Sequence, residues 1–422
     1  MNVSQIQSRQ DMSTAPDCQA CGARLTRSFV DLGVQPLANS YIPLDRADAP
    51  EPVFPLHARV CDACLLVQVD KVTPPETIFN DGYAYFSSFS ESWLDHCRAY
   101  ADAMTKRFDL GRESRVVEIA SNDGYMLQYF VAKGIPVLGV EPAANVAAAA
   151  EARGVPTEIA FFGSDTAARL ATAGWSADLL AAKNVMAHVP DINDFVAGIQ
   201  ILLKPRGVFT VEFPHLLNLI REIQFDTIYH EHFTYLSLLA VKAIFERHGL
   251  SVFDVEKQPT HGGSLRVFAA RCEAGYPVSM NVERLLAEER AARLDRAEGY
   301  GGFAERVGIV RDELRNFLAK AREEGRSVAA YGAAAKGNTL LNYCGITSAD
   351  IRFAVDRNPA KQNRLLPGSH IPVQDPAMLD TERPDYVLIL PWNLRDEIIA
   401  QNPQVRAWGG RFVTAIPSVR ID

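Results

Sequence analysis

Four neighbouring residues could move protons, because the sequence from 229 to 232 reads Tyr-His-Glu-His. Histidine titrates near neutrality, and a neighbouring glutamate can orient an imidazole or favour its charged form. We therefore interpret Tyr229, Glu231 and His232 as a candidate acid–base cluster. Two alternatives are a metal site, although no further carboxylate or cysteine is near in the sequence, and a plain cluster of core or surface histidines.

Two Cys-x-x-Cys pairs predict a metal site near the N-terminus. Four thiolates complete a closed tetrahedral zinc site that has no open coordination position, so the zinc would be structural. The other three cysteines are isolated, and in a reducing compartment this pattern favours a metal over disulfides. An RNA-binding zinc ribbon is an alternative, but the module has few basic residues. The expected ligands are Cys18, Cys21, Cys61 and Cys64.

The segment 116–141 predicts a nucleoside-binding α/β unit: an apolar strand, a tight turn, a helix and a second apolar strand that ends in an acid. An acid at that position can accept hydrogen bonds from a ribose diol. Among the glycines of a dinucleotide-binding turn, only Gly124 is present. S-adenosylmethionine, which is cationic and has no pyrophosphate, suits such a turn and its acids better. A βαβ unit without this ligand is the alternative. The expected cofactor contacts are Glu118, Ala120, Asn122, Gly124, Glu141 and Pro142.

The rest of this module alternates strands and helices. We expect residues 160–163 to end a third strand, where Phe162 would flank adenine. A fourth strand, at 178–188, carries Asn184 and His188 to the carboxyl edge of the sheet, where ligands of open α/β sheets bind. Strands at 251–256 and 264–271 would close a seven-stranded sheet with an antiparallel edge. His261 begins the last strand and is expected to face the same cleft, unless its two following glycines only form a turn.

An aromatic, hydroxyl-rich segment at 81–90 precedes this module. We expect it to form a lid over a small ligand, with Tyr83 and Ser88 as hydrogen-bond donors. An aromatic loop packed between modules is the alternative.

The C-terminal sequence predicts a second Rossmann-like half. After charged helices at 281–326, a strand at 328–331 leads into a small-residue loop and a helix. This loop can place backbone N–H groups and the Lys336 ammonium on phosphates. A G-x-G-x-x-G motif is absent, so a nucleoside diphosphate is favoured over NAD, and a structural βαβ domain is the alternative. The candidate substrate contacts are Lys336, Gly337, Asn338, Asp356, Lys361 and Asn393.

Composition indicates an ordinary globular protein of two or three domains, with 422 residues, 48% hydrophobic and 22% charged. A net charge of −8 argues against non-specific nucleic-acid binding. We find no apolar run of membrane-spanning length and no signal-peptide core, so we expect a cytoplasmic enzyme.

With these motifs in place, the chain resembles the sugar C-methyltransferases that act on nucleotide-linked 4-keto deoxysugars. The resemblance implies a zinc-binding module (1–80), a class I, Rossmann-like methyltransferase domain (81–275), a helical connector (276–326) and a Rossmann-like nucleotide-sugar domain (327–422). It also implies a monomer and a dTDP-linked substrate, with GDP or CDP as alternatives. The motifs that carry it are the two cysteine pairs and residues 33–40, 83–88, 118–124, 184–188, 229–232, 332–337 and 391–393.

The resemblance also implies a mechanism for deoxysugar biosynthesis. A 4-keto group acidifies the C3 proton, a base removes it, and the resulting enolate attacks the methyl group of S-adenosylmethionine. By resemblance His232 is the base, Tyr229, Glu231 and His188 place or stabilise the enolate, and Asn184 and Tyr83 hold the substrate. The alternatives are a sugar O-methyltransferase on the same scaffold, an NAD-dependent nucleotide-sugar oxidoreductase and a zinc scaffold without activity.

Overall fold

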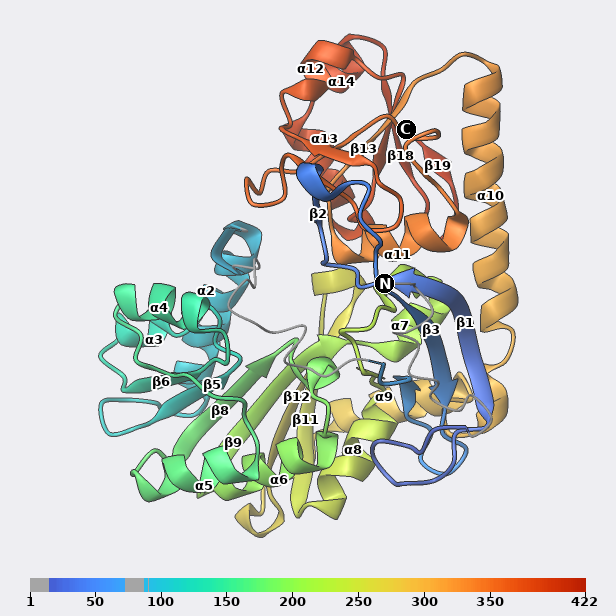
Figure 1. Ribbon diagram of the computed structural model, residues 1–422. Helices are drawn as coiled ribbons and strands as arrows, with labels where there is room; N and C mark the ends of the chain where they lie inside the picture. Colours follow the sequence, from blue (N-terminus) through green and yellow to red (C-terminus); the bar gives the residue numbers. More distant parts are fainter. Residues whose placement is uncertain (1–14, 73–86, 90) are drawn as a thin grey trace.

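The computed structural model describes residues 15–72, 87–89 and 91–422, and these residues form three sheets (Figure 1). In the view of Figure 1 the C-terminal sheet lies at the top, the central sheet at the lower left, and β1 and β3 at the lower right. Across the described ranges, no helix combines the length and apolar character needed to cross a membrane.

The central sheet has seven strands in the order β11-β12-β9-β8-β5-β6-β7, which confirms the class I methyltransferase architecture. The strands β5 to β9 run parallel, and β12 is antiparallel to both of its neighbours. The antiparallel strand is thus one place in from the edge, which β11 forms. The bounds are β5 Val116–Ile119, β6 Val137–Val140, β7 Thr157–Glu158, β8 Ala177–Lys183, β9 Leu203–Pro214, β11 Leu250–Gln258 and β12 Ser264–Arg271.

Both faces of this sheet are covered, which is why its strands read as continuous apolar runs. Val116 belongs to the core beneath α2 and α3, whereas Val117 faces α5, α6 and α8. Successive side chains of a strand point to opposite faces, so the two residues serve different cores. The helices are α2 Glu91–Arg107, α3 Gln128–Val131, α4 Ala144–Ala152, α5 Ser164–Thr172, α6 Ile192–Leu202, α8 Leu238–Arg247 and α9 Met280–Ala291.

The expected third strand is shorter than predicted. It ends at Glu158, and residues 160–163 lead into α5 instead. The backbone N–H of Ser164 donates to Asp194 Oδ1 at 3.1 Å, and this contact starts the helix directly after Gly163. The expectation that residues 160–163 end a strand is therefore wrong.

The N-terminal sheet has the order β1-β3-β4-β10. Its fourth strand comes from the middle of the chain and directly follows the Tyr-His-Glu-His stretch. Thr234 of β10 pairs with Gln68 of β4 in antiparallel register. The bounds are β1 Arg27–Pro36, β3 Val53–Val60, β4 Val67–Val69 and β10 Thr234–Tyr235.

The C-terminal sheet has eight strands in the order β19-β18-β17-β13-β14-β16-β15-β2. Its edge strand β2 (Ile42–Pro43) belongs to the N-terminal segment, so strands are shared between the parts of the chain in two places. The remaining bounds are β13 Val328–Tyr331, β14 Ala354–Val355, β15 Arg364–Leu365, β16 Pro372–Gln374, β17 Tyr386–Ile389, β18 Arg411–Thr414 and β19 Arg420–Ile421.

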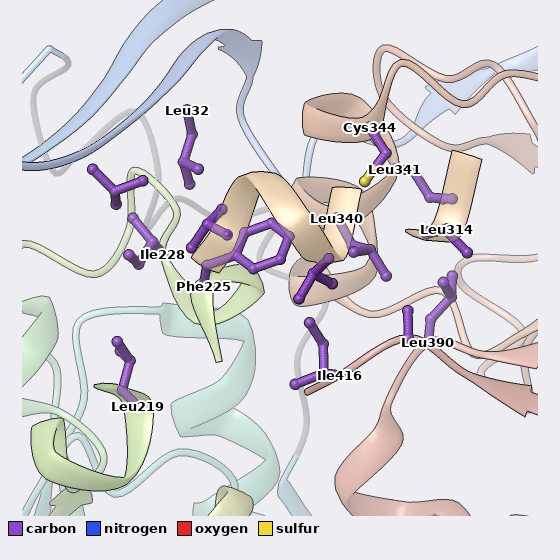
Figure 2. Packing of buried hydrophobic residues seen from close by; sticks show 14 of the residues in the cluster. Leu32, Leu219, Phe225, Ile228, Leu314, Leu340, Leu341, Cys344, Leu390 and Ile416 are labelled. Carbon is purple, nitrogen blue, oxygen red and sulfur yellow. The ribbon is translucent and has the colours of Figure 1, made fainter. Parts of the chain in front are cut away.

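One hydrophobic cluster joins all three parts. Figure 2 shows Leu32 of the N-terminal sheet, Phe225 of the central part and Leu340 of the C-terminal part within one packed group. The long helix α10 (Phe303–Glu323) and α11 (Ala335–Cys344) both contribute to it. Burial of such side chains stabilises by roughly 1.5–3 kcal/mol each, so the parts are held together by packing.

Candidate functional site

A cavity of about 1270 Å³ opens at the carboxyl edge of the central sheet. All three parts of the chain line it: Asn39 and Tyr41 from the N-terminal segment, Glu141 and His232 from the central part, and Lys336 from α11. Pockets for one small ligand measure roughly 300–1,000 Å³, so this cavity suits a cofactor together with a second molecule.

The turn after β5 has the left-handed backbone that a glycine-rich turn needs. Ala120 has φ 54°, Asn122 φ 48° and Gly124 φ 75°. Ala120 and Asn122 thus take the backbone role of the missing glycines. Glu141 braces this turn, because its carboxylate accepts from the backbone N–H of Asn122 at 3.1 Å and from that of Ala143 at 3.0 Å.

The cavity residues fit S-adenosylmethionine. Burial raises the pKa of Glu141, so a ribose diol or a cationic group would favour its ionised form. Phe162, predicted to flank adenine, lines the cavity and packs edge-on against Phe195. The Oδ1 atom of Asn184 is buried and accepts no hydrogen bond from the described residues, which leaves it free for an ammonium donor. Ala120, Asn122 and Pro142 also line the cavity.

Two of the predicted contacts, Glu118 and Ser88, do not line the cavity. Glu118 is fully buried behind the turn, where burial raises its pKa and the Tyr125 hydroxyl and the Lys183 charge oppose that rise. Ser88 donates to Asp123 and accepts from Arg153 at 2.8 Å, so it braces the turn from outside the cavity. Its neighbour Ser87 lines the cavity instead. Tyr83 lies outside the described residues, as does most of the segment 81–90.

The histidine cluster has a defined tautomer. Nδ1 of His232 lies 2.8 Å from the backbone oxygen of Thr227, which can only accept, so Nδ1 carries the proton. Nε2 therefore offers a lone pair, and the Tyr229 hydroxyl lies 2.8 Å from it. Burial, together with the nearby His188 and Lys336, lowers the pKa of His232 well below its usual value. The ring is thus uncharged at neutral pH.

His188 is arranged in the same way. Its Nδ1 lies 2.8 Å from the backbone oxygen of Glu231, and its ring is edge-on to His232 at a centroid distance of 4.6 Å. Burial lowers the pKa of His188 to about 4. The Glu231 side chain accepts from Asn39 Nδ2 at 2.6 Å, while burial raises its pKa to about 7. His230, by contrast, contacts Pro55 and Phe54 of the N-terminal sheet.

A buried ionic network beside the cavity was not predicted. Lys183 contacts the carboxylate of Glu212, Arg266 Nε lies 2.7 Å from it, and His96 Nε2 lies 2.8 Å from it. Burial alone would raise the pKa of Glu212, but these three neighbours hold it well below its usual range. Lys183 and His96 line the cavity. The sequence signal is a charge that interrupts an apolar strand, as Glu212 does.

The C-terminal domain supplies Lys336, whose Nζ donates to Asn393 Oδ1 at 2.7 Å. Lys361 also lines the cavity and donates to the backbone oxygen of Ala333 at 2.7 Å. Asp356 accepts from the backbone N–H of Ala333 at 2.7 Å and so shapes the loop before α11.

The other predicted C-terminal contacts have packing roles. Gly337 packs closely on Leu390, the residue after β17, because a Cβ there would lie 2.8 Å from its side chain. Asn338 is buried and donates to the backbone oxygen of Ala38 at 2.7 Å, which ties α11 to the N-terminal segment.

His261 faces the cavity, as expected. It adopts φ 55°, and the amide of Asn184 donates to its Nε2 at 3.0 Å. Burial and the Lys336 charge lower the pKa of His261 to about 4.

The four predicted zinc ligands converge, with all four sulfur atoms within 4.8 Å of one another. The Sγ atoms of Cys18 and Cys64 lie 3.6 Å apart and those of Cys21 and Cys61 lie 3.5 Å apart. Zn–S bonds of roughly 2.3 Å place tetrahedral sulfurs at about this separation, so the residues fit structural zinc. Gln68 Nε2 donates to Cys18 Sγ at 3.2 Å and orients this ligand.

Family models match most of the chain. The model of the C-methyltransferase C-terminal domain matches residues 259–417, a methyltransferase domain matches residues 91–255, and a zinc binding domain matches residues 18–79. The first match covers β12 of the central sheet and most of the C-terminal sheet, the second covers β5 to β9, and the third covers the cysteine cluster.

The similar proteins are also methyltransferases. The chain is 38% identical over 405 residues to the C-methyltransferase NovU of Streptomyces niveus, and the alignment covers 96% of both proteins. It is 25% identical over 159 residues to a ubiquinone biosynthesis O-methyltransferase of Rhodopseudomonas palustris (strain BisA53), which covers 33% of this chain and 63% of that protein. A solved methyltransferase from Mesorhizobium loti covers 42% of this chain and 100% of its own at 15% identity, but its TM-score of 0.34 supports no argument.

Proposed function

Because the chain belongs to the family of S-adenosylmethionine-dependent C-methyltransferases, we propose that it methylates C3 of a nucleotide-linked 4-keto-6-deoxy sugar in deoxysugar biosynthesis. The observation that carries this proposal is the neutral His232, whose unprotonated Nε2 faces Tyr229 inside a cavity lined by the cofactor turn and the C-terminal domain. A carbon nucleophile has to be made by deprotonation, and this arrangement supplies the base.

The cofactor supplies an electrophilic methyl group when it is bound. The chain's own residues prepare the nucleophile. The Tyr229 hydroxyl points at His232 Nε2. A substrate carbonyl oxygen that accepts the hydrogen bond of Tyr229 instead frees Nε2 to take the C3 proton. The carbanion so formed would accept the methyl group that the bound cofactor supplies.

The second half of the cavity supports a nucleotide-linked substrate. The N-terminus of α11 and Lys361 both line it, and helix N-termini and lysines are common partners of phosphate groups. We propose dTDP as the nucleotide, with GDP and CDP as alternatives, and a monomer as the working unit. In this proposal the domains keep the boundaries 1–80, 81–275, 276–326 and 327–422.

The test incubates the protein in deuterated water with dTDP-4-keto-6-deoxyglucose, its 3-deoxy and 3-amino relatives, and the GDP- and CDP-linked forms. A mass gain of one methyl group with S-adenosylmethionine, and deuterium exchange at C3 without it, would support C-methylation. A methyl gain without exchange would favour O-methylation. Neither signal with any of these sugars would overturn the proposed substrate class.

A further inference from the structure

Lys336 brings a positive charge from the C-terminal domain into the histidine cluster. Lys336 lies in the first turn of α11 and lines the cavity that the three parts of the chain share. Lys336, His232 and His261 line the same cavity. The Trp392 ring, whose centroid lies 4.8 Å from the Lys336 ammonium, packs closely against Gly262, the residue after His261. Lys336 thus faces the reacting end of the cavity.

The Lys336 ammonium lacks a direct ion-pair partner. It donates to Asn393 Oδ1 at 2.7 Å and lies 4.8 Å from the ring centroid of Trp392. Within residues 15–72, 87–89 and 91–422, no carboxylate oxygen lies within 4.0 Å of Nζ. An ammonium has three N–H donors, and a buried cation is costly unless an anion completes its surroundings. The arrangement therefore points to an anionic atom of the ligand.

Asp226 does not supply that anion at contact distance. Its Oδ2 accepts from the indole N–H of Trp392 at 2.7 Å, so this acid fixes Trp392 rather than pairing with the lysine. Trp392 in turn packs on Gly262, where a Cβ would lie 2.4 Å from the ring. The Trp392 indole and Asn393 therefore fix the position of Lys336 relative to the central domain.

A cation in the same cavity as His232 opposes the positive charge that this ring gains as a base. Its presence is favourable only if a negative charge forms nearby in the same step. Removal of a proton next to a carbonyl creates such a charge on the carbonyl oxygen, and preorganised cations at developing oxyanions give some of the largest catalytic effects.

We propose that Lys336 binds the substrate carbonyl oxygen that becomes negative on deprotonation, and that it is a catalytic residue rather than a phosphate ligand. In this step the C3–H bond breaks, its proton moves to His232 Nε2, and the electron pair moves onto the carbonyl oxygen beside Lys336. When C3 bonds to the methyl carbon, the carbonyl reforms and the sulfur leaves with the old bonding pair. This inference rests on the proposed function.

The experiment compares wild type with Lys336→Met at saturating nucleotide sugar in deuterated water without S-adenosylmethionine. We expect the variant to lose C3 exchange by roughly 100-fold or more, and methyl transfer with it. Binding of the free nucleoside diphosphate, which has no carbonyl oxygen at that position, should change less than about 3-fold by calorimetry. Lys336→Gln keeps an N–H donor without the charge and should show the same loss, while S-adenosylmethionine binding reports folding in both variants.

Lys361→Met is the contrasting variant. The Lys361 ammonium lies 5.4 Å from the centroid of the Tyr41 ring and donates to the backbone oxygen of Ala333, in the loop before α11. It should weaken nucleoside diphosphate binding and raise KM. If Lys336→Met keeps wild-type exchange at saturation but binds the nucleoside diphosphate at least 10-fold more weakly, Lys336 is a phosphate ligand and the inference is overturned. Absence of exchange and methyl transfer in the wild type would instead overturn the proposed function.

Discussion

The hydroxyl oxygen of Tyr229 lies 2.8 Å from Nε2 of His232, whose other ring nitrogen is held by the backbone oxygen of Thr227. The carbonyl fixes the proton on Nδ1, and burial keeps the ring neutral. A neutral imidazole whose lone pair is already engaged by a removable donor is suited to general-base catalysis.

The first prediction concerns this base. His232→Gln should retain S-adenosylmethionine binding, because the ring nitrogens contact Thr227 and Tyr229 rather than the turn at 120–124. It should lose both C3 exchange and methyl transfer by roughly 100-fold to 10,000-fold, the usual contribution of a positioned base. Exchange is followed by mass in deuterated water and cofactor binding by calorimetry.

Tyr229→Phe serves as the matched comparison. It leaves Nε2 of His232 unengaged but removes the proton that the substrate oxygen would accept, so turnover should fall while some exchange persists. Normal methyl transfer by His232→Gln would reject the assignment of this residue as the base.

The second prediction concerns pH. Burial raises the pKa of Glu231 to about 7, while the hydrogen bond from Asn39 opposes this rise. Glu231 is therefore ionised above about pH 7, where its negative charge stabilises the imidazolium formed on His232. We expect log kcat to rise with pH through about 7 in the wild type and to be flat there in Glu231→Gln.

Asn39→Ala is a control that should shift this pH profile in a known direction. Loss of the amide donor removes an interaction with the charged form, so the pKa of Glu231 should rise and the activity limb should move to higher pH. A limb that stays near pH 7 in Glu231→Gln would show that another group titrates there.

Sequence patterns predicted the central sheet, the C-terminal Rossmann-like half and the cysteine cluster because these depend on local signals. Apolar runs predicted the central strands, and the paired cysteines predicted the metal ligands. Contacts between distant segments could not be predicted in the same way. Asn39 meets Glu231 across 192 residues, and Trp392 meets Asp226 across 166 residues. Such pairs depend on how the three parts pack, which single-sequence periodicity does not report.

The third prediction is one zinc ion per chain. Metal analysis should find it, and chelation should lower the melting temperature together with activity. The reason is that Asn193 and Arg247 of the central domain donate to the backbone oxygen of Ala20 in the first cysteine turn, at 3.1 and 2.9 Å. Loss of the metal would therefore disturb the docking of the segment that lines the cavity.

Cys61→Ser should reproduce the effect of chelation, whereas Cys272→Ser should not, because Cys272 is exposed and distant in sequence from the cluster. A metal-free protein with full activity would contradict the predicted role of the four thiolates.

The fourth prediction links Asp226 to stability. Burial raises its pKa to about 6, against the opposing effects of Lys336 and Trp392. A folded-state pKa above the unfolded value stabilises the protein at low pH, and that stability is lost as pH rises through about 6. The Asp226→Asn variant keeps an oxygen that can accept the hydrogen bond of the Trp392 indole, but its amide does not titrate. Relative to this variant, the wild type should lose about 1 kcal/mol of unfolding free energy between pH 5 and pH 7.5. Paired thermal melts across this range measure the difference, and the exposed Asp48→Asn should show none of it; parallel curves for wild type and Asp226→Asn would mean that Asp226 stays ionised throughout.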